Sequence, residues 1–306
     1  MKVLVTGGAG FIGSHLCQKL IKKGIQTVVL DNLSVGKKEN ISPDSEFVKG
    51  DIQDLDLVKK VVGGVEAVYH LAANVTIRGS VDKFYEDAQT NIMGTLNLLR
   101  ACKGSPVKKF IFSSSMAVYA DSPDPTPISE NWAKEPISPY GIAKLASERY
   151  VLVAGKQMGI SPTVLRFFNI YGPNQTYTPY VGVITIFINR LLANQSLSIF
   201  GDGEQKRDFV YVGDIAEAAS RVLESEAAGQ IMNVGTGKPT SVNQIANLLI
   251  KKIRPEVKPD YQEAHPGELR YSIADPSLLE KITSFKPQTR LEDKIDEVIE
   301  EIKKQK

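Results

Sequence analysis

A tyrosine and a lysine four positions apart are the side chains whose types and spacing most directly suggest chemistry. Tyr140 and Lys144 stand at the start of a segment, 139–158, that predicts a helix, so they share one face and lie one turn apart. A nearby ammonium favours the phenolate, which would let a tyrosine with an ordinary pKa of about 10 act as a base closer to neutral pH. Alone, this spacing is common and usually marks a surface pair. Ser115, the last of three serines ending a predicted strand, and the turn described next make it specific.

A glycine-rich turn near the N-terminus predicts a dinucleotide site. Gly7, Gly8, Gly10 and Gly13 join an apolar strand, 2–5, to an amphipathic helix, 11–23. Glycines allow the tight bend and a close approach of the pyrophosphate, and the helix N-terminus faces the negative charge. Asp31 ends the next predicted strand, 18 residues after Gly13. A carboxylate there accepts hydrogen bonds from the adenosine ribose and repels a 2′-phosphate, which favours NAD over NADP. An ordinary tight turn is the less favoured interpretation in this context.

Asp51 and Ile52 follow the third predicted strand and leave two interpretations open. Asp51 could contact the edge of the adenine while Ile52 supplies an apolar wall. Alternatively, Asp51 could simply cap the next turn. The spacing alone favours neither interpretation.

The order of predicted elements places these features on one parallel sheet. Short β-branched strands over 2–5, 27–30, 46–48, 67–71, 109–112 and 162–167 alternate with helical segments, including 82–101 and 139–158. Right-handed crossovers make this an α/β fold with a doubly wound parallel sheet (Rossmann), whose ligand crevice lies at the carboxyl ends of the strands.

Beyond Asn169 the chain is richer in glycine and proline turns, which predicts a smaller C-terminal α/β lobe that binds substrate. Helical periodicity returns at 183–193, 212–223, 242–253 and 291–303. We expect an NAD-binding Rossmann domain over 1–168, with returning segments near 208–235, and a mainly substrate-binding lobe over 169–306.

Composition excludes several other classes of protein. Lys and Arg total 37 against 35 Asp and Glu, a net charge of +2, so binding of nucleic acid by bulk charge is not indicated. Cys17 and Cys102 are the two cysteines, too few for a disulfide framework or a cysteine-ligated zinc site, and a cytoplasmic location is expected. The sequence shows no targeting leader and no membrane-length apolar run. His15, His70 and His265 lack metal-ligand spacing, so no metal is expected.

Nearly the whole chain resembles the extended short-chain dehydrogenase/reductase family and, within it, nucleotide-sugar epimerases of the UDP-glucose 4-epimerase type. The matching segments are 6–14 (TGGAGFIGS), 31–34 (DNLS), 50–52 (GDI), 70–73 (HLAA), Asn91, 112–115 (FSSS), 140–144 (YGIAK), 165–173 (LRFFNIYGP), 201–203 (GDG), 207–210 (RDFV), 233–237 (NVGTG) and 266–268 (PGE).

The resemblance implies a role for each matching residue. Tyr140 would be the general base, Lys144 would bind the nicotinamide ribose and lower the pKa of the tyrosine, and Ser115 would hydrogen-bond the reacting sugar hydroxyl. The implied NAD-binding residues are Gly7, Gly10, Phe11, Ile12, Gly13, Asp31, Asn32, Asp51, Ile52, Leu71, Ala72, Ala73, Asn91, Tyr140 and Lys144. The implied substrate-binding residues are Ser115, Tyr140, Asn169, Arg207, His265, Glu268 and Arg270.

Among the substrate-binding residues, Arg207 resembles the arginine that grips the substrate diphosphate. His265 stands where relatives usually carry a second such arginine, which leaves His265 or Arg270 to serve.

The implied reaction is NAD-dependent 4-epimerisation of a UDP-hexose, with UDP-glucose and UDP-galactose favoured, through a 4-keto intermediate. Met116 and Ala117 follow Ser115 where 4,6-dehydratases carry carboxylates, so dehydration is disfavoured. The loop 172–176 lacks the arginine that uronate-using relatives place there, which favours a neutral hexose. Ser272 matches the position that limits the sugar 2-substituent, and a small residue there would admit an N-acetyl group.

Three alternatives therefore remain beside the UDP-hexose 4-epimerase: a UDP-N-acetylhexosamine or UDP-uronate 4-epimerase, a 4,6-dehydratase, and an NAD-binding regulatory protein. The last is disfavoured because Tyr140 and Lys144 are both present. The resemblance also implies a homodimer formed through the helices near 82–101 and 139–158, although their apolar residues could equally belong to the core.

Overall fold

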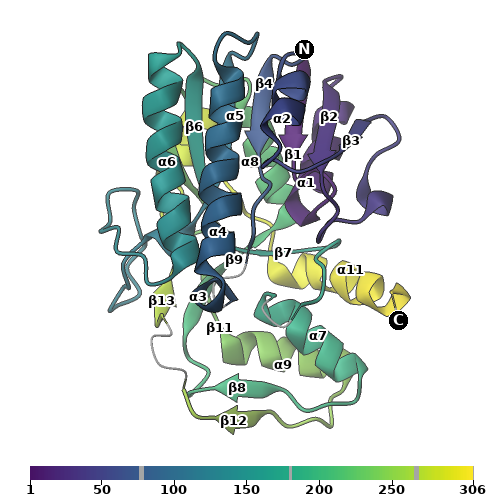
Figure 1. Ribbon diagram of the computed structural model, residues 1–306. Coiled ribbons are helices and arrows are strands. Elements are labelled where there is room, and N and C mark those ends of the chain that lie inside the picture. The colour runs from purple at the N-terminus through teal and green to yellow at the C-terminus, as the bar shows by residue number, and fades with distance from the viewer. Residues whose placement is uncertain (76–78, 179–180, 265–268, 306) are drawn as a thin grey trace.

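A seven-stranded parallel sheet forms the upper part of the molecule in the computed structural model, which describes residues 1–75, 79–178, 181–264 and 269–305 (Figure 1). Its strands are β1 (Lys2–Thr6), β2 (Gln26–Asp31), β3 (Glu46–Lys49), β4 (Ala67–His70), β5 (Lys109–Ser115), β6 (Ser161–Phe167) and β10 (Ile231–Val234). Their order across the sheet is β10-β6-β5-β4-β1-β2-β3. The doubly wound fold expected from the sequence is confirmed.

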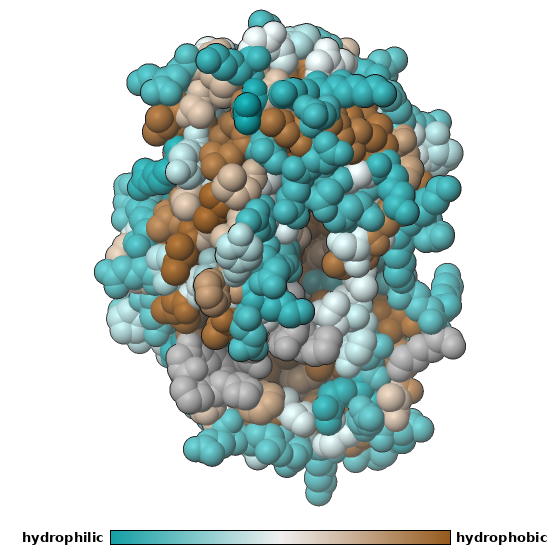
Figure 2. Space-filling model, viewed as in Figure 1, coloured by the Kyte–Doolittle hydropathy of each residue, from teal (hydrophilic) through white to brown (hydrophobic). Residues whose placement is uncertain are grey.

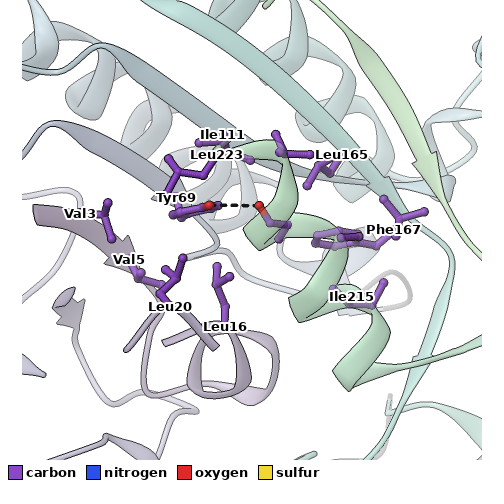
Figure 3. Close-up of a cluster of buried hydrophobic side chains, with 14 of the residues drawn as sticks. Val3, Val5, Leu16, Leu20, Tyr69, Ile111, Leu165, Phe167, Ile215 and Leu223 are labelled. Atoms are coloured by element: carbon purple, nitrogen blue, oxygen red, sulfur yellow. Dashed lines mark hydrogen bonds between the residues drawn. The ribbon is translucent and has the colours of Figure 1, made fainter. Parts of the chain in front are cut away.

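Alternating side chains of each strand pack on opposite faces of this sheet, as the period of a β-strand requires. Val3 and Val5 contribute to a core under α1 (Phe11–Lys22), α8 (Val212–Val222) and α10 (Ser277–Thr283). Figure 3 shows this cluster, in which the Tyr69 hydroxyl donates to the carbonyl oxygen of Ala219 at 3.0 Å. Leu4 faces the other way, toward α2 (Leu55–Val62), α5 (Gly94–Cys102) and α6 (Pro139–Gln157).

The helix expected over 82–101 is interrupted in the structure. It consists of α3 (Gly79–Asp82), α4 (Phe84–Ala88), a π-helical turn over Gln89–Met93 and then α5. The carbonyl oxygen of Asn91, inside the π turn, accepts hydrogen bonds from the hydroxyls of Thr95 at 2.7 Å and of Ser147 at 2.9 Å. Ser147 lies on α6, so the interruption joins this helix to the helix that carries the tyrosine and the lysine.

A smaller lobe lies below the sheet in Figure 1. Its elements are β7 (Asn169–Tyr171), α7 (Val183–Leu192), β8 (Ser198–Phe200), β9 (Lys206–Tyr211), β11 (Pro239–Ser241), α9 (Val242–Ile253), β12 (Asp260–Gln262), β13 (Tyr271–Ser272) and α11 (Leu291–Lys304). β9 pairs with β7, β11 and β13, and β8 pairs with β12. Its own apolar core lies between α7, α9 and α11.

The remaining short elements are the 3-10 helices η1 (Lys38–Asn40) and η3 (Met116–Val118). The second half of the chain does not stay in the smaller lobe, because α8 and β10 return to the large sheet. Across the described ranges, none of the helices combines the length and apolar character needed to span a bilayer.

Candidate active site

The start of α6 holds Tyr140 and Lys144 against the end of β5. Ser138 caps the helix, its hydroxyl oxygen accepting from the backbone N–H of Gly141 at 3.1 Å, and Pro139 occupies the first turn, as predicted. Tyr140 is 5% exposed and Lys144 is 3% exposed. The Lys144 ammonium donates to the carbonyl oxygen of Ser113 at 2.8 Å and lies 5.8 Å from the centre of the Tyr140 ring.

Burial dominates the protonation equilibria of this pair. It raises the pKa of Tyr140 to about 12, an effect that a hydrogen bond with Ser115 opposes and the charge of Asp87 reinforces. Burial lowers the pKa of Lys144 to about 8, against the charges of Asp87 and Glu148, which raise it. In the chain alone, Tyr140 is therefore a neutral phenol. Burial therefore outweighs the gain in base strength that the spacing of the pair leads one to expect. The sequence does not reveal how deeply the pair is buried.

The glycine turn leads from β1 into α1 as the sequence predicts. Gly7 adopts a φ of +72°, and a Cβ at Gly13 would overlap the carbonyl oxygen of Gly7. Gly10 is the N-cap of α1, and no side chain caps the first amides of that helix. Those amides are the donors that a pyrophosphate would accept from. Phe11 and Ile12, also predicted to bind the cofactor, form the first turn of the helix.

Asp31 ends β2 beside this turn. Its carboxylate accepts hydrogen bonds from the backbone N–H groups of Ala9 at 3.0 Å and Leu33 at 2.8 Å. Leu33 has a φ of +62°, a conformation that costs free energy in a non-glycine residue. Each Asp31 oxygen keeps a second lone pair for a ribose hydroxyl. The helix amides and this carboxylate therefore fit an adenine dinucleotide.

Asp51 makes the local contact that the capping interpretation describes. Its carboxylate accepts from the backbone N–H of Gln53 at 2.9 Å and from the side-chain amide of Asn32 at 2.8 Å. Helix α2 itself is capped by Asp54. Ile52 is 4% exposed and belongs to the core beneath the sheet. Contacts of Asn32, Asp51 and Ile52 with an adenine stay predictions.

Asn91 is buried beside the segment Leu71, Ala72 and Ala73, and its side chain forms several hydrogen bonds. Its Oδ1 accepts from the backbone N–H of Asn74 at 2.8 Å, and its amide donates to the Asn74 carbonyl at 3.0 Å and to Asp87 at 2.9 Å. Both amide hydrogens are used, so a direct contact with the cofactor would go through the second lone pair of Oδ1.

A buried histidine connects the same region to β1. The Ala72 N–H donates to the Thr6 hydroxyl, which is 2.9 Å from Nδ1 of His70, and Nε2 of His70 is 2.9 Å from the Thr95 hydroxyl. Because Thr95 donates onward to Asn91, Nε2 carries the proton and Nδ1 accepts. Burial lowers the pKa of His70 to about 3, so the ring is neutral and structural, as the sequence indicated.

The smaller lobe brings three candidate substrate residues to one face of its sheet. Asn169 pairs in register with Phe209 of β9, and Ser272 pairs with Arg207 of the same strand. Arg207 and Phe209 are two residues apart, so their pairs lie on the same face. The Nδ2 atom of Asn169 and the hydroxyl of Ser272 are buried without a hydrogen-bond partner in the described ranges. Buried polar atoms of this kind are expected where a ligand completes the site.

The two arginines expected near the diphosphate have different surroundings. The Arg207 guanidinium donates to the carbonyl oxygens of Lys206, Leu269 and Arg270, the shortest of these at 2.6 Å to Leu269. Arg270 forms a bidentate ion pair with Asp202, at 2.7 and 2.9 Å, which lowers the pKa of Asp202 to about 2. His265 and Glu268 lie outside the described residues.

Sequence reasoning missed three groups near the site. Glu148, one turn beyond Lys144, forms a fully buried bidentate ion pair with Arg166 of β6 and accepts from the Ser114 hydroxyl. Asp87 lies one turn before Asn91. The amide oxygen of Gln205 has no described hydrogen-bond partner, and Gln205 and Arg270 both line a cavity of about 90 Å³. Signals for the first two groups were available in the sequence. They are the i,i+4 spacing of Glu148 from Lys144 and of Asp87 from Asn91, and the charge of Arg166 within an apolar strand.

Among the residues that the structure describes, no group of three or more His, Cys, Asp or Glu side chains could hold a metal ion. His15 is engaged by the carbonyl oxygen of Pro173, 3.1 Å from its Nε2. Cys17 and Cys102 are buried free thiols, and burial raises the pKa of each to about 12.

Comparison with known proteins identifies the family of this chain. The model of the NAD dependent epimerase/dehydratase family matches residues 3–235. The crystal structure of UDP-glucose 4-epimerase with UDP-glucose from Thermotoga maritima is 39% identical, with a TM-score of 0.95, and the match covers 100% of this chain and 99% of that one. UDP-N-acetylglucosamine 4-epimerase from Methanobrevibacter ruminantium, in complex with UDP-N-acetylmuramic acid, is 37% identical, with a TM-score of 0.94 and coverage of 100% and 99%.

A third solved structure contains the cofactor. UDP-glucuronic acid 4-epimerase from Bacillus cereus, in complex with UDP-glucuronic acid and NAD, is 33% identical, with a TM-score of 0.92 and coverage of 100% of both chains. These matches confirm the predicted family, the NAD cofactor and the isomerase class. The chain belongs to the NAD dependent epimerase/dehydratase family, among its nucleotide-sugar epimerases.

Proposed function

We propose that this chain catalyses the 4-epimerisation of a UDP-hexose, with UDP-glucose and UDP-galactose as the favoured pair. The observation that carries the proposal is the pairing of Tyr140 with Ser115 at the end of β5, followed directly by an apolar turn. Ser115 is linked to Tyr140 by a hydrogen bond, and its hydroxyl also accepts from the backbone N–H of Ala117 at 3.2 Å. Met116 and Ala117 form the start of η3 and cannot transfer the protons that elimination of water needs. This favours epimerisation over dehydration.

In the proposed mechanism, NAD supplies the acceptor and donor of the hydride at C4 of the sugar. Tyr140 takes the proton from the 4-hydroxyl and later returns it to the same oxygen, when the hydride is delivered to the opposite face of C4 of the 4-keto sugar. Ser115 holds the reacting oxygen. Lys144, while charged, stabilises the phenolate of Tyr140 and binds the nicotinamide ribose. Proton and hydride are both returned, so the product has the mass of the substrate.

The smaller lobe would hold the rest of the substrate. We assign the buried Nδ2 of Asn169 as a hydrogen-bond donor to the sugar and Arg207 as the diphosphate ligand, because a guanidinium binds phosphate oxygens with paired donors. His265, Glu268 and Arg270 complete the proposed contacts. Arg270 would have to exchange its bond with Asp202 for one with the ligand.

A UDP-N-acetylhexosamine is the second candidate substrate, and Ser272 is the observation in its favour. Ser272 is 0% exposed, and its hydroxyl has no partner in the described part of the chain, so a small side chain with a spare hydroxyl borders the proposed sugar site. The loop 172–176 carries no arginine to pair with a uronate carboxylate, which disfavours the UDP-uronate alternative.

We also propose a homodimer, because an exposed apolar face is shared by α6 and the neighbouring interrupted helix that begins with α3 and α4. Val81, Phe84 and Met93 on one side and Ile142 and Val153 on α6 are each between 47% and 64% exposed. Figure 2 shows hydrophobic residues gathered over the part of the surface where Figure 1 places α5 and α6. Burying this face would be favourable. Light scattering should give twice the chain mass, and Val153→Glu should give a monomer; an unchanged mass in the variant would remove this face from the interface.

A cytoplasmic location is proposed as well, since both cysteines are free and buried.

A panel of substrates tests the choice of sugar. The purified protein is incubated with UDP-glucose, UDP-N-acetylglucosamine and UDP-glucuronate, and the products are resolved by chromatography and proton NMR. The proposal predicts the largest kcat/KM for UDP-glucose. Ser272→Tyr should block the N-acetyl substrate more strongly than UDP-glucose, whereas a higher kcat/KM for UDP-glucuronate would contradict the assignment.

A further inference from the structure

A buried carboxylate that is only half satisfied lies beside the catalytic helix. Asp87, on α4, is 1% exposed. Its Oδ1 accepts from the Asn91 amide at 2.9 Å, whereas its Oδ2 is shielded from solvent and has no hydrogen-bond partner in the described ranges. A carboxylate oxygen without a donor in the protein interior costs free energy unless an opposite charge compensates it.

Lys144 is the cation whose charge acts on Asp87. Helix α4 packs against α6, and Asn91, the partner of Asp87, is bound to α6 through the Ser147 hydroxyl at 2.9 Å. Ser147 lies three residues after Lys144 and therefore on the same side of the helix. The charges of Asp87 and Lys144 act on each other, and Asp87 also acts on Tyr140.

The other ionisable groups around Lys144 are already balanced. Glu148, on α6, is paired with Arg166 of β6 through two hydrogen bonds of 2.7 and 2.8 Å. His70, on β4, is neutral because burial lowers its pKa, and its ring nitrogens are bound to Thr6 and Thr95. On β5, Lys144 contacts an uncharged carbonyl, that of Ser113. Asp87 is therefore the carboxylate, within the described chain, that is left to balance the ammonium of Lys144.

We propose that Asp87 is a positioning residue of the epimerase reaction, which keeps Lys144 charged beside Tyr140 and so sets the pH range in which the tyrosine works. Asp87 acts through these two side chains and does not touch the substrate. The amide of Asn91 fixes one oxygen of Asp87, and the other oxygen has no hydrogen-bond partner in the described ranges. This inference rests on the proposed function where turnover is measured.

Asp87→Asn tests it, because the variant keeps an oxygen for Asn91 and loses the charge. Loss of an anion lowers the pKa of every ionisable neighbour, so the pH profile of kcat/KM should move as a whole to lower pH, by about one unit. At pH 8 the variant should be several-fold slower than the wild type, and at lower pH it should recover. A purely structural residue would change the height of the profile without moving it along the pH axis.

Glu86→Gln is the matched control, since Glu86 is the preceding residue on α4 and is exposed. Its profile should overlay that of the wild type. Thermal melting and the amount of bound NAD check that each variant folds, and Asp87→Ser carries the same test if the asparagine variant does not. A profile of Asp87→Asn that stays in place would overturn the proposal.

A titration without substrate separates this inference from the proposed function. The tyrosinate absorbance of the holoenzyme is followed with pH, and the curve of its Tyr140→Phe variant is subtracted to isolate Tyr140. Asp87→Asn should lower the midpoint. A lowered midpoint in a protein that turns over no UDP-sugar would support the role of Asp87 and contradict the epimerase, whereas an unmoved midpoint would contradict the role of Asp87.

Discussion

The ammonium of Lys144 donates to the carbonyl oxygen of Ser113, 2.8 Å away, and this bond ties helix α6 to β5, the strand that carries Ser115. Ser115 lies two residues further along β5, and its hydroxyl interacts with that of Tyr140. The three side chains of the proposed site are thus held by one helix and one strand rather than by loops. Such support keeps a reacting oxygen and its base in a fixed relation.

Replacing Tyr140 by phenylalanine should abolish turnover while leaving the cofactor bound. The variant removes the hydroxyl that exchanges a proton with the sugar and keeps the ring that packs in the core, so we expect a loss of at least about 100-fold in kcat. Tyr150→Phe, on the exposed side of the same helix, is the control and should keep its rate. Epimerase rate and bound NAD are measured together; near-normal turnover in Tyr140→Phe would remove this residue from the base role.

Activity should fall as the pH rises through about 8. Lys144 has a pKa lowered to about 8 by burial, so below that pH it carries the charge that supports the phenolate, and above it the charge is lost. The effect of Lys144 on stability has the opposite sign to its effect on activity. The native state binds fewer protons than the unfolded chain between pH 8 and about 10.4, so this residue makes the free energy of unfolding rise over that range. Rate profiles and denaturant titrations across pH 7–10 check both directions.

Glu148→Gln should be strongly destabilising. The change would leave the guanidinium of Arg166, 0% exposed, without its counter-charge, and breaking one side of a buried pair costs about 3–5 kcal/mol. Glu46→Gln is the matched control, because the pair of Glu46 with Lys2 is exposed and should be worth less than about 1 kcal/mol. The free energy of unfolding is measured in urea. Equal losses in the free energy of unfolding for the two variants would contradict the larger contribution expected of the buried pair.

Gly13→Ala should impair both the glycine turn and cofactor binding. A methyl group there overlaps the carbonyl oxygen of Gly7, which is backbone and cannot rotate away. Gly64→Ala introduces the same methyl group with only an ordinary contact, 3.8 Å from the carbonyl oxygen of Val61, and should leave NAD binding unchanged. Retention of NAD on purification and calorimetric affinity report the outcome. Undiminished NAD binding by Gly13→Ala would contradict the close packing of this turn.

Features that depend on local periodicity could be predicted from the sequence. The large sheet follows from its β-branched runs, the pairing of Tyr140 with Lys144 from the spacing of a helix, and the nucleotide turn from glycines next to Asp31. The start of α6 follows from Ser138 and Pro139, whose preferences are local.

Features that depend on distant contacts could not be predicted in this way. The π turn around Asn91 exists together with a hydrogen bond to Ser147, 56 residues away. The strands of the smaller lobe are as short as two or three residues and are defined by pairing, as when β9 meets both β7 and β13. The pKa of Tyr140 rises because of burial, a property of the folded chain that its spacing from Lys144 does not reveal.

The most direct test of the epimerase assignment follows the hydrogen at C4. UDP-glucose carrying deuterium at C4 is incubated with the purified protein in ordinary water, and the products are examined by NMR and mass spectrometry. The account predicts UDP-galactose of unchanged mass that keeps the deuterium at C4, because the hydride leaves and returns within one site. Loss of the label, a product lighter by one water, or no 4-epimer at all would contradict it.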